Sequence, residues 1–511
     1  MRRTEFVFVL VIALAAASCS KDTATTAAAT STTAAATTTT ALEYEPVFTS
    51  APCDATRVPP APAVVECGTL TVPANRSKAD STQIVLPVAI LKASKEPKQP
   101  DPIIYFSGGP GDAGLQSSIR WDKLPLAPDH DVITFDQRGT GASTPSLDCP
   151  EVDTATLNMF ETPLPPAQEG PAVEAAFSAC HDRLVTEGID LGDYNTINVA
   201  DDVADLKRAL KIGTWNLFGI SYGTAVALEV MRSHPEGVRS TLIDSVYPPD
   251  VGFGAATFDD ADRVFNVLID GCAKQPTCAA DHPDLRAELQ AAVDRLDTTP
   301  YSLDIKVKDR TLKGQFTGTD LVGGLFNAMY DSDLIPLIPY FIKQVADGNV
   351  AILNAVASDG IATLTEGSEA QTASVECGDR QRLIDQDAVQ KSIALHPLYG
   401  LIAAGRPLPQ ICPAWKVPSA PKAYNTIPTT KIPTLVFGDE YDPITPPANS
   451  ERTAKALGSK ATFVLFPGLG HGAIRARPCP LQIYQAFVAA PTAVVDTGCV
   501  AAMPAPDFKT G

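Results

Sequence analysis

The chain is short of positive charge. Its 511 residues include 40 Lys and Arg against 59 Asp and Glu, which gives a formal net charge of −19. Nucleic-acid binding needs clustered Lys and Arg to neutralise phosphates, so this composition argues against a nucleic-acid partner. The acidity is typical of a solvated surface on a secreted protein.

Motifs typical of zinc sites are missing. The sequence has no CxxC pair and no HExxH, and His occurs six times. The sequence therefore predicts no metal site.

The N-terminus lacks an apolar run long enough for a stable membrane span, since its apolar segment ends at Ala17. A positive "MRR" precedes this segment and "AAASCS" follows it, as in a bacterial lipoprotein signal in which Cys19 becomes the lipidated first residue. Residues 1–18 are the predicted signal peptide. An ordinary secretory signal cut near Ser18 is the alternative, and both predict an exported chain.

A stalk is expected at 19–48, because the Thr/Ala tract at 23–41 has no large apolar residue with which to build a core. Such a segment would hold the folded part away from a membrane surface. We expect membrane contact through the lipid anchor alone.

Of the 11 cysteines, ten remain when Cys19 is set aside, an even number that favours disulfides in an exported protein. Short loops favour the first three of the following pairs, and the last two join the four cysteines that remain, for which other pairings stay open. The expected pairs are Cys53–Cys67, Cys272–Cys278, Cys479–Cys499, Cys149–Cys180 and Cys377–Cys412.

Short apolar runs ending in Gly- or Asp-rich turns predict strands buried on both faces, with helical patterns at 198–211 and 221–233 between them. The predicted strands are 67–73, 83–93, 102–111, 131–139, 214–220, 240–246, 433–442 and 461–471. Alternating strands and helices imply an α/β fold with a doubly wound, mostly parallel sheet.

The alternation stops in the middle of the chain, over a stretch too long for a loop. We therefore expect an inserted, largely helical lid at 251–425, between a core at 49–250 and its C-terminal part at 426–511.

Gly219, Ser221 and Gly223 form a G-x-S-x-G turn where a strand becomes a helix. Such a turn exposes the serine hydroxyl at the carboxyl end of a strand, and the Tyr222 amide then opens a helix that favours a developing oxyanion. A strand–helix turn without chemistry is the alternative.

A serine nucleophile needs a base and an acid, which this fold supplies in the order Ser, Asp or Glu, His. His471 lies in the glycine-flanked turn "FPGLGHG" after the last apolar strand. Asp442 in "GDEYDPITPP" is the expected acid and Asp439 is the alternative. The Gly109 amide in "FSGGPG" is the expected second oxyanion donor.

Together, "SGGPGDAG", "FDQRGTGAS", "GISYGT", "GDEYDPITPP" and "GLGHG" resemble the α/β-hydrolases of the proline iminopeptidase and tripeptidyl aminopeptidase group. The resemblance implies an α/β-hydrolase fold, a triad at Ser221, Asp442 and His471, and lid carboxylates that hold a substrate ammonium. In "SVECGDR", Glu376 and Asp379 are the candidates, with solvated surface or a salt bridge as the alternative for both.

The predicted function is a serine hydrolase that releases residues or short peptides from the free N-terminus of a peptide, through an acyl-enzyme and without a cofactor. A carboxylesterase or lipase with the same triad is the alternative, and a non-catalytic surface binding lipoprotein is a second. The sequence predicts no oligomeric state.

Overall fold

The structure is a computed structural model, and it describes residues 44–58, 64–116, 126–252, 255–307, 310–354, 367–400, 408–476 and 478–510. The predicted signal peptide, Cys19 and most of the predicted stalk lie outside these ranges. Within them, none of the helices is both long and apolar enough to cross a membrane.

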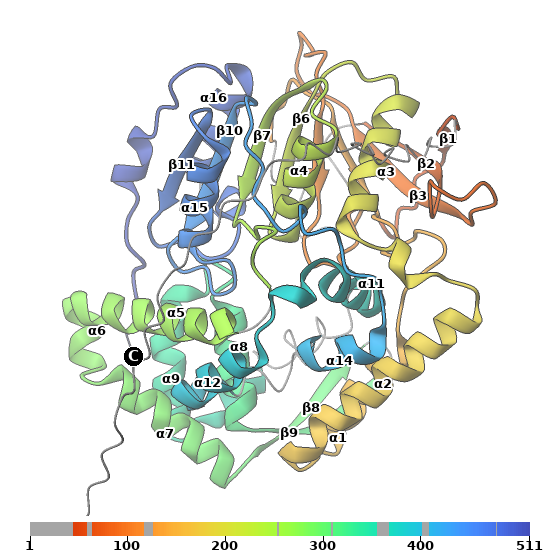
Figure 1. Ribbon diagram of the computed structural model, residues 1–511. Helices are drawn as coiled ribbons and strands as arrows, with labels where there is room; N and C mark the ends of the chain where they lie inside the picture. Colours follow the sequence, from red (N-terminus) through yellow and green to blue (C-terminus); the bar gives the residue numbers. More distant parts are fainter. Residues whose placement is uncertain are drawn as a thin grey trace, which may run out of the picture. The chain divides into compact units, whose positions relative to one another are not determined.

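A nine-stranded sheet forms the centre of the fold, in the order β1-β2-β3-β5-β4-β6-β7-β10-β11 (Figure 1). Strands β1, β2, β3 and β5 pair antiparallel, and all pairs from β5 to β11 are parallel. The strands are β1 (Val47–Ala51), β2 (Val65–Pro73), β3 (Gln83–Leu91), β4 (Ile103–Phe106), β5 (Val132–Phe135), β6 (Trp215–Ile220), β7 (Val238–Asp244), β10 (Thr434–Asp439) and β11 (Ala461–Phe466). The predicted mostly parallel sheet is therefore confirmed.

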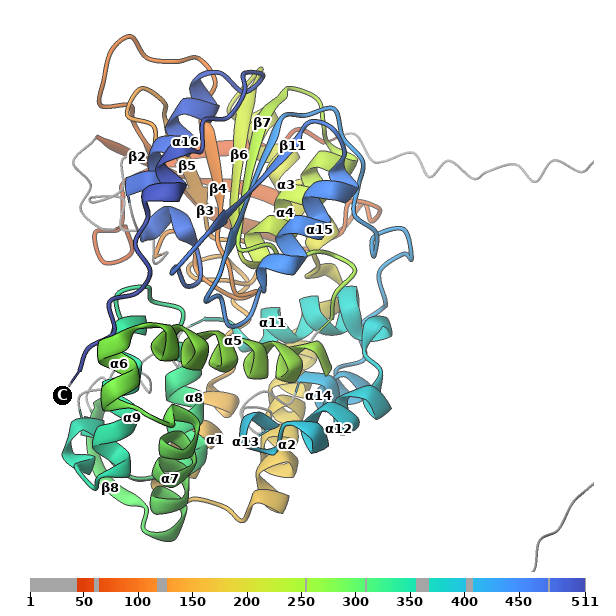
Figure 2. The same ribbon diagram turned by 90° about the vertical axis from the view of Figure 1, so that its left-hand side faces the viewer.

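Helices cover both faces of this sheet, with α3 (Thr196–Ala209), α4 (Tyr222–Ser233) and α15 (Pro447–Leu457) on one face and α16 (Pro478–Ala489) on the other (Figure 2). Alternate strand residues serve the two sides, because side chains along a strand point to opposite faces. Ile104 packs into the core with α3 and α4, and its neighbour Ile103 packs into the core with α16.

Between β7 and β10 most of the chain packs around a second apolar core, which also includes Tyr441 and Phe508. The described helices of this segment are α5 (Ala255–Lys274), α6 (Pro276–Asp281), α7 (Leu285–Thr298), α8 (Gly318–Ala328), α9 (Ile338–Ala346), α11 (Glu369–Val375), α12 (Gln386–Leu395), α13 (Pro397–Gly400) and α14 (Leu408–Trp415). Of these, α11 and α14 pack into the core that contains α3 and α4. A hairpin of β8 (Tyr301–Val307) and β9 (Arg310–Phe316) was not expected from the sequence. We call this excursion the lid.

Two earlier helices, α1 (Pro150–Glu161) and α2 (Pro166–Thr186), pack against β9 and α14 of the lid. Two helices that pack on the lid thus come from residues 49–250, the segment predicted as the first part of the core. The division into a core at 49–250, a lid at 251–425 and a C-terminal core part at 426–511 stays a prediction.

The ordered chain reaches into the segment predicted as stalk, since β1 begins at Val47. Phe48 pairs with Leu70 of β2 and lies over Gly68, where a Cβ would come within 2.4 Å of its ring. Phe48 packs against the core, which gives this short strand a reason to stay on the sheet.

Five disulfides join the ten cysteines of the described chain, in the pairs expected from the sequence. Disulfides persist in oxidising compartments, so they indicate an exported protein.

Candidate active site

Ser221 stands between β6 and α4 with φ 57° and ψ −127°, a strained backbone conformation for a residue with a side chain. The flanking glycines make the turn possible. A Cβ at Gly219 would lie 2.3 Å from the carbonyl oxygen of Gly223, and a Cβ at Gly223 would lie 2.2 Å from that of Phe106. The turn thus brings β6, α4 and β4 too close together for any larger residue.

The predicted second oxyanion donor lies in a glycine loop against this turn. A Cβ at Gly108 would be 3.3 Å from Cβ of Ser221, and the next residue, Gly109, has φ +98°. The lid holds this loop, because Thr372 of α11 donates to the carbonyl of Pro110 at 2.6 Å. Loop and serine are therefore neighbours, and α11 covers the loop.

Asp442 and His471 form a buried pair, in which Nδ1 of His471 lies 2.8 Å from Oδ2 of Asp442. Asp442 is fully buried, and its other oxygen accepts from the amides of Ile444 at 3.0 Å and Thr445 at 2.8 Å. Burial alone would raise the pKa of Asp442, but His471 and the hydrogen bonds from Thr445 outweigh it and hold the pKa below its usual value. The carboxylate is thus kept ionised beside the imidazole.

Thr445 is a site residue that sequence reasoning missed. Its hydroxyl donates to Oδ2 of Asp442 at 2.7 Å and lies 3.1 Å from Nδ1 of His471. It follows Asp442 by three residues, in a turn that also directs its amide to the same carboxylate. The D-P-I-T pattern could have indicated it, because an Asp that begins a turn accepts hydrogen bonds from the backbone amides just after it, which brings the Thr close to the carboxylate.

Asp439, the alternative acid, has no hydrogen bond to the His471 ring in the described chain. Its Oδ2 accepts from the hydroxyl of Ser245 at 2.9 Å and from the amide of Ala473 at 3.2 Å. Asp244, at the end of neighbouring β7, accepts from Ala473 at 3.3 Å and from Ile474 at 3.0 Å. Both carboxyls therefore support the backbone that follows His471.

Asp244 also connects the histidine loop to the serine turn, because its carbonyl accepts from the Ser221 amide at 3.1 Å. The hydroxyl of Ser245, the next residue, accepts from the Gly472 amide at 2.8 Å. The end of β7 thus holds the serine on one side and the histidine loop on the other.

The two predicted lid carboxylates lie in different settings, although both are buried. The hydroxyl of Tyr247 donates to the Glu376 carboxylate, at 3.0 Å to Oε2. Oδ2 of Asp379 accepts at 3.1 Å from the amide of Thr196, the first residue of α3, and burial raises the pKa of this carboxyl. Asp379 therefore ties the lid to a helix of the sheet, as a structural contact.

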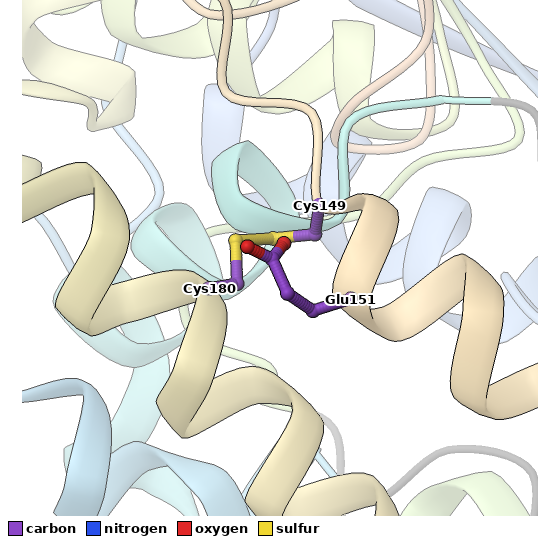
Figure 3. A group of neighbouring side chains, drawn as sticks. All are labelled: Cys149, Glu151 and Cys180. Atoms are coloured by element: carbon purple, nitrogen blue, oxygen red, sulfur yellow. A yellow bond between two sulfur atoms is a disulfide. The ribbon is translucent and has the colours of Figure 1, made fainter.

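One group of possible metal-ligating side chains occurs in the described chain, at Cys149, Glu151 and Cys180 (Figure 3). The two sulfurs are joined in a disulfide, so neither is available as a thiolate ligand. Glu151 is paired with Arg183 at 2.6 Å. The chemistry of this donor set does not fit a metal.

Two family models match the chain. Residues 101–263, which include Gly109 and Ser221, match the model described as alpha/beta hydrolase fold. Residues 402–499, which include Asp442 and His471, match the model described as TAP-like protein. The predicted α/β-hydrolase fold is thereby confirmed.

Curated relatives are similar over most of their length. Serine protease Hip1 of Mycobacterium tuberculosis is 25% identical, covering 78% of this chain and 80% of the relative. Tripeptidyl aminopeptidase of Streptomyces lividans is 28% identical, covering 75% of this chain and 74% of the relative. Carboxylesterase B of Mycobacterium tuberculosis is 23% identical, covering 80% of this chain and 81% of the relative.

Proposed function

Because the chain belongs to the α/β-hydrolases of the tripeptidyl aminopeptidase-like group, we propose that it is an exported serine peptidase acting on the free N-terminus of peptides. The observation that carries the proposal is the buried Asp442–His471 pair, on a loop held at the same strand end as the Ser221 turn. A strained serine and a buried acid–base pair, both held at the end of β7, are the parts that acyl transfer needs.

In the proposed reaction His471 takes the Ser221 proton while the hydroxyl oxygen attacks the scissile carbonyl. Asp442 holds the imidazole and stabilises its cationic form. The amides of Gly109 and Tyr222 receive the oxyanion, and one such donor contributes about 3 kcal/mol to transition-state stabilisation. His471 then protonates the leaving amine, and water attacks the acyl-enzyme with His471 again as base.

Glu376 is the proposed partner of the substrate ammonium. It follows Thr372 by one helical turn, and residues so spaced share a helix face. Thr372 contacts the oxyanion loop, so this face of α11 turns toward the candidate site. Tyr247, which donates to Glu376, is linked back to the serine turn because its amide donates to the Thr224 hydroxyl at 2.9 Å, and that hydroxyl donates to the Ser221 carbonyl at 2.6 Å.

The test compares hydrolysis of a short peptide amide of Ala-Pro-Ala type with a free and with an acetylated N-terminus, using wild type and Ser221→Ala. We expect strong preference for the free form and no hydrolysis by Ser221→Ala. Equal hydrolysis of both forms would remove the free-N-terminus part of the proposal. Full activity of Ser221→Ala would show that Ser221 is not the nucleophile.

Glu376→Gln and Asp379→Asn form a matched pair, since each replaces one buried carboxyl of the same lid segment by an amide. We expect Glu376→Gln to raise KM for the free peptide about ten- to hundredfold, the loss of a charge-assisted contact, while hydrolysis of a short ester is retained. We expect Asp379→Asn to lower Tm and to leave the discrimination between free and acetylated peptides intact. A higher KM for the free peptide in Asp379→Asn, with KM unchanged in Glu376→Gln, would instead assign binding of the substrate ammonium to Asp379.

A carboxylesterase is the second candidate, favoured by the similarity to Carboxylesterase B. The same nucleophile, acid–base pair and oxyanion donors can cleave esters as well as amides. Hydrolysis of a short-chain ester through Ser221 with no cleavage of either peptide would favour it. Failure of Ser221 to react with a fluorophosphonate probe would instead favour a non-catalytic binding protein.

We also propose that Cys19 anchors the exported chain to the outer face of the cell membrane. The "AAASCS" signal and the Thr/Ala tract support this proposal. Metabolic labelling with a fatty acid should mark the wild type and not Cys19→Ser, which should be released. Equal labelling of both would contradict the anchor.

A further inference from the structure

Five consecutive amides around His471 are divided between the lid and the sheet. The amides of Gly472, Ala473 and Ile474 donate to side chains at the ends of β7 and β10. The two amides before them, those of Gly470 and His471, donate instead to the lid. His471 therefore stands at the point where its loop passes from one support to the other.

The lid contacts come from the residues just after α8. The Gly470 amide donates to the hydroxyl of Ser332 at 3.0 Å, and the His471 amide donates to the carbonyl of Tyr330 at 3.1 Å. The Tyr330 ring also packs on the His471 ring, with centroids 4.9 Å apart and planes at 57°. Ser332 and His471 are 5% and 7% exposed, so little water reaches these contacts.

Lid and loop approach each other closely at Gly470. A Cβ at Gly470 would come within 2.2 Å of the carbonyl oxygen of Met329. Met329 is itself fully buried in the apolar core of the lid, with Phe326 and Leu325 of α8. The segment Met329–Ser332 is thus anchored in the lid, and a shift of α8 would move the support of the histidine.

We propose that Ser332 is a positioning residue for His471, so that the lid helps to set the geometry of the candidate base. This inference rests on the proposed function in one respect, namely that His471 is the base. Asp442 holds the imidazole from the side of the sheet through one nitrogen. From the lid, Ser332 accepts from the amide of Gly470, the residue before His471. Tyr330 accepts from the His471 amide and packs on the His471 ring, and both supports are needed to orient the imidazole.

The test uses Ser332→Ala, with Ser392→Ala as the matched control. Ser392 is another buried lid serine, 4% exposed, and its hydroxyl donates to Asp259 at 2.6 Å, away from the loop. A short-chain ester is the substrate, because it has no N-terminal ammonium and its hydrolysis reports on the proposed triad without the contact to Glu376. Active sites are counted with a fluorophosphonate, so that kcat refers to folded enzyme.

We expect Ser332→Ala to lower kcat about two- to tenfold with KM unchanged, the effect of one lost hydrogen bond. Ser392→Ala should leave kcat unchanged, and Ser332→Thr, which keeps the hydroxyl, should recover most of it. Equal kcat for Ser332→Ala and Ser392→Ala would overturn the inference, as would a loss confined to the number of titrated sites. If the wild type neither reacts with the probe nor hydrolyses the ester, the proposed function itself fails, and the inference with it.

Discussion

Asp244 and Asp439, on adjacent parallel strands, both accept a hydrogen bond from the amide of Ala473. Each is fully buried, and neither has a hydrogen bond to an arginine or lysine within the described chain. Two carboxyls that share one amide cannot both ionise easily, because burial and mutual repulsion favour the neutral form. Burial raises the pKa of both carboxyls, so the backbone after His471 rests on two acids that ionise less readily than exposed ones.

The first prediction concerns stability against pH. Burial raises the pKa of Asp244 to about 6, above the usual value of 3.8. The folded protein then binds a proton that the unfolded chain has released, so the contribution of Asp244 to stability is greatest below pH 4 and is lost as pH rises to about 6. As pH rises across this range, the free energy of unfolding of Asp244→Asn should increase by on the order of 2 kcal/mol relative to that of wild type.

The measurement is the difference in Tm between Asp244→Asn and wild type at a series of pH values from 4 to 7. The control is Glu174→Gln, which removes the carboxylate of an exposed glutamate on α2. Its Tm should run parallel to wild type. A Tm difference for Asp244→Asn that stays constant with pH would show that this carboxyl ionises freely in the fold.

The second prediction concerns Thr445. Thr445→Val removes the hydroxyl that donates to Asp442 and should lower kcat about two- to tenfold, with Thr445→Ser close to wild type. Thr453→Val is the control, because Thr453 is also fully buried but its hydroxyl has no hydrogen-bond partner among the described residues. Steady-state kinetics on a short ester would check this, and a Thr445→Val kcat as high as that of the control would contradict it.

The third prediction concerns the glycine before the serine. Gly219→Ala places a Cβ 2.3 Å from the Gly223 carbonyl oxygen and should destabilise the fold by about 3 kcal/mol or more. Gly213→Ala, just before the same strand, has nothing within 4 Å of its new Cβ and should change stability by less than about 0.5 kcal/mol. Thermal unfolding of both variants checks this, and similar Tm values would be inconsistent with the close approach.

The fourth prediction concerns the disulfide next to Glu376. Cys377–Cys412 ties the helical turn that follows α11 to α14 and closes a loop of sequence separation 35. Replacing both cysteines by Ser should lower stability by about 3–4 kcal/mol. It should also raise KM for free-N-terminus peptides more than KM for a short ester, because the Glu376 segment is loosened. Equal changes in both KM values would show that the segment around Glu376 has no specific role in binding the peptide.

Much of the central sheet could be predicted because its strands are short apolar runs with clear turns, and β6 and β7 lie where the sequence placed them. Strand β1 was missed because four of its five residues are exposed, which leaves no apolar pattern to read. The β8–β9 hairpin was missed because it belongs to a lid whose core is built from distant helices.

The sequence by itself determined the local parts of the site: a serine between two glycines, a histidine in a glycine turn, and carboxylates at the end of a strand. These are local because turn chemistry and strand ends depend on neighbouring residues. Asp439 ends β10 and Asp442 lies three residues further on, and only the path of the loop from β11 decides which of these two carboxylates meets the imidazole. The contacts of Ser332 with this loop join residues 138 positions apart, and packing of the lid alone brings them together.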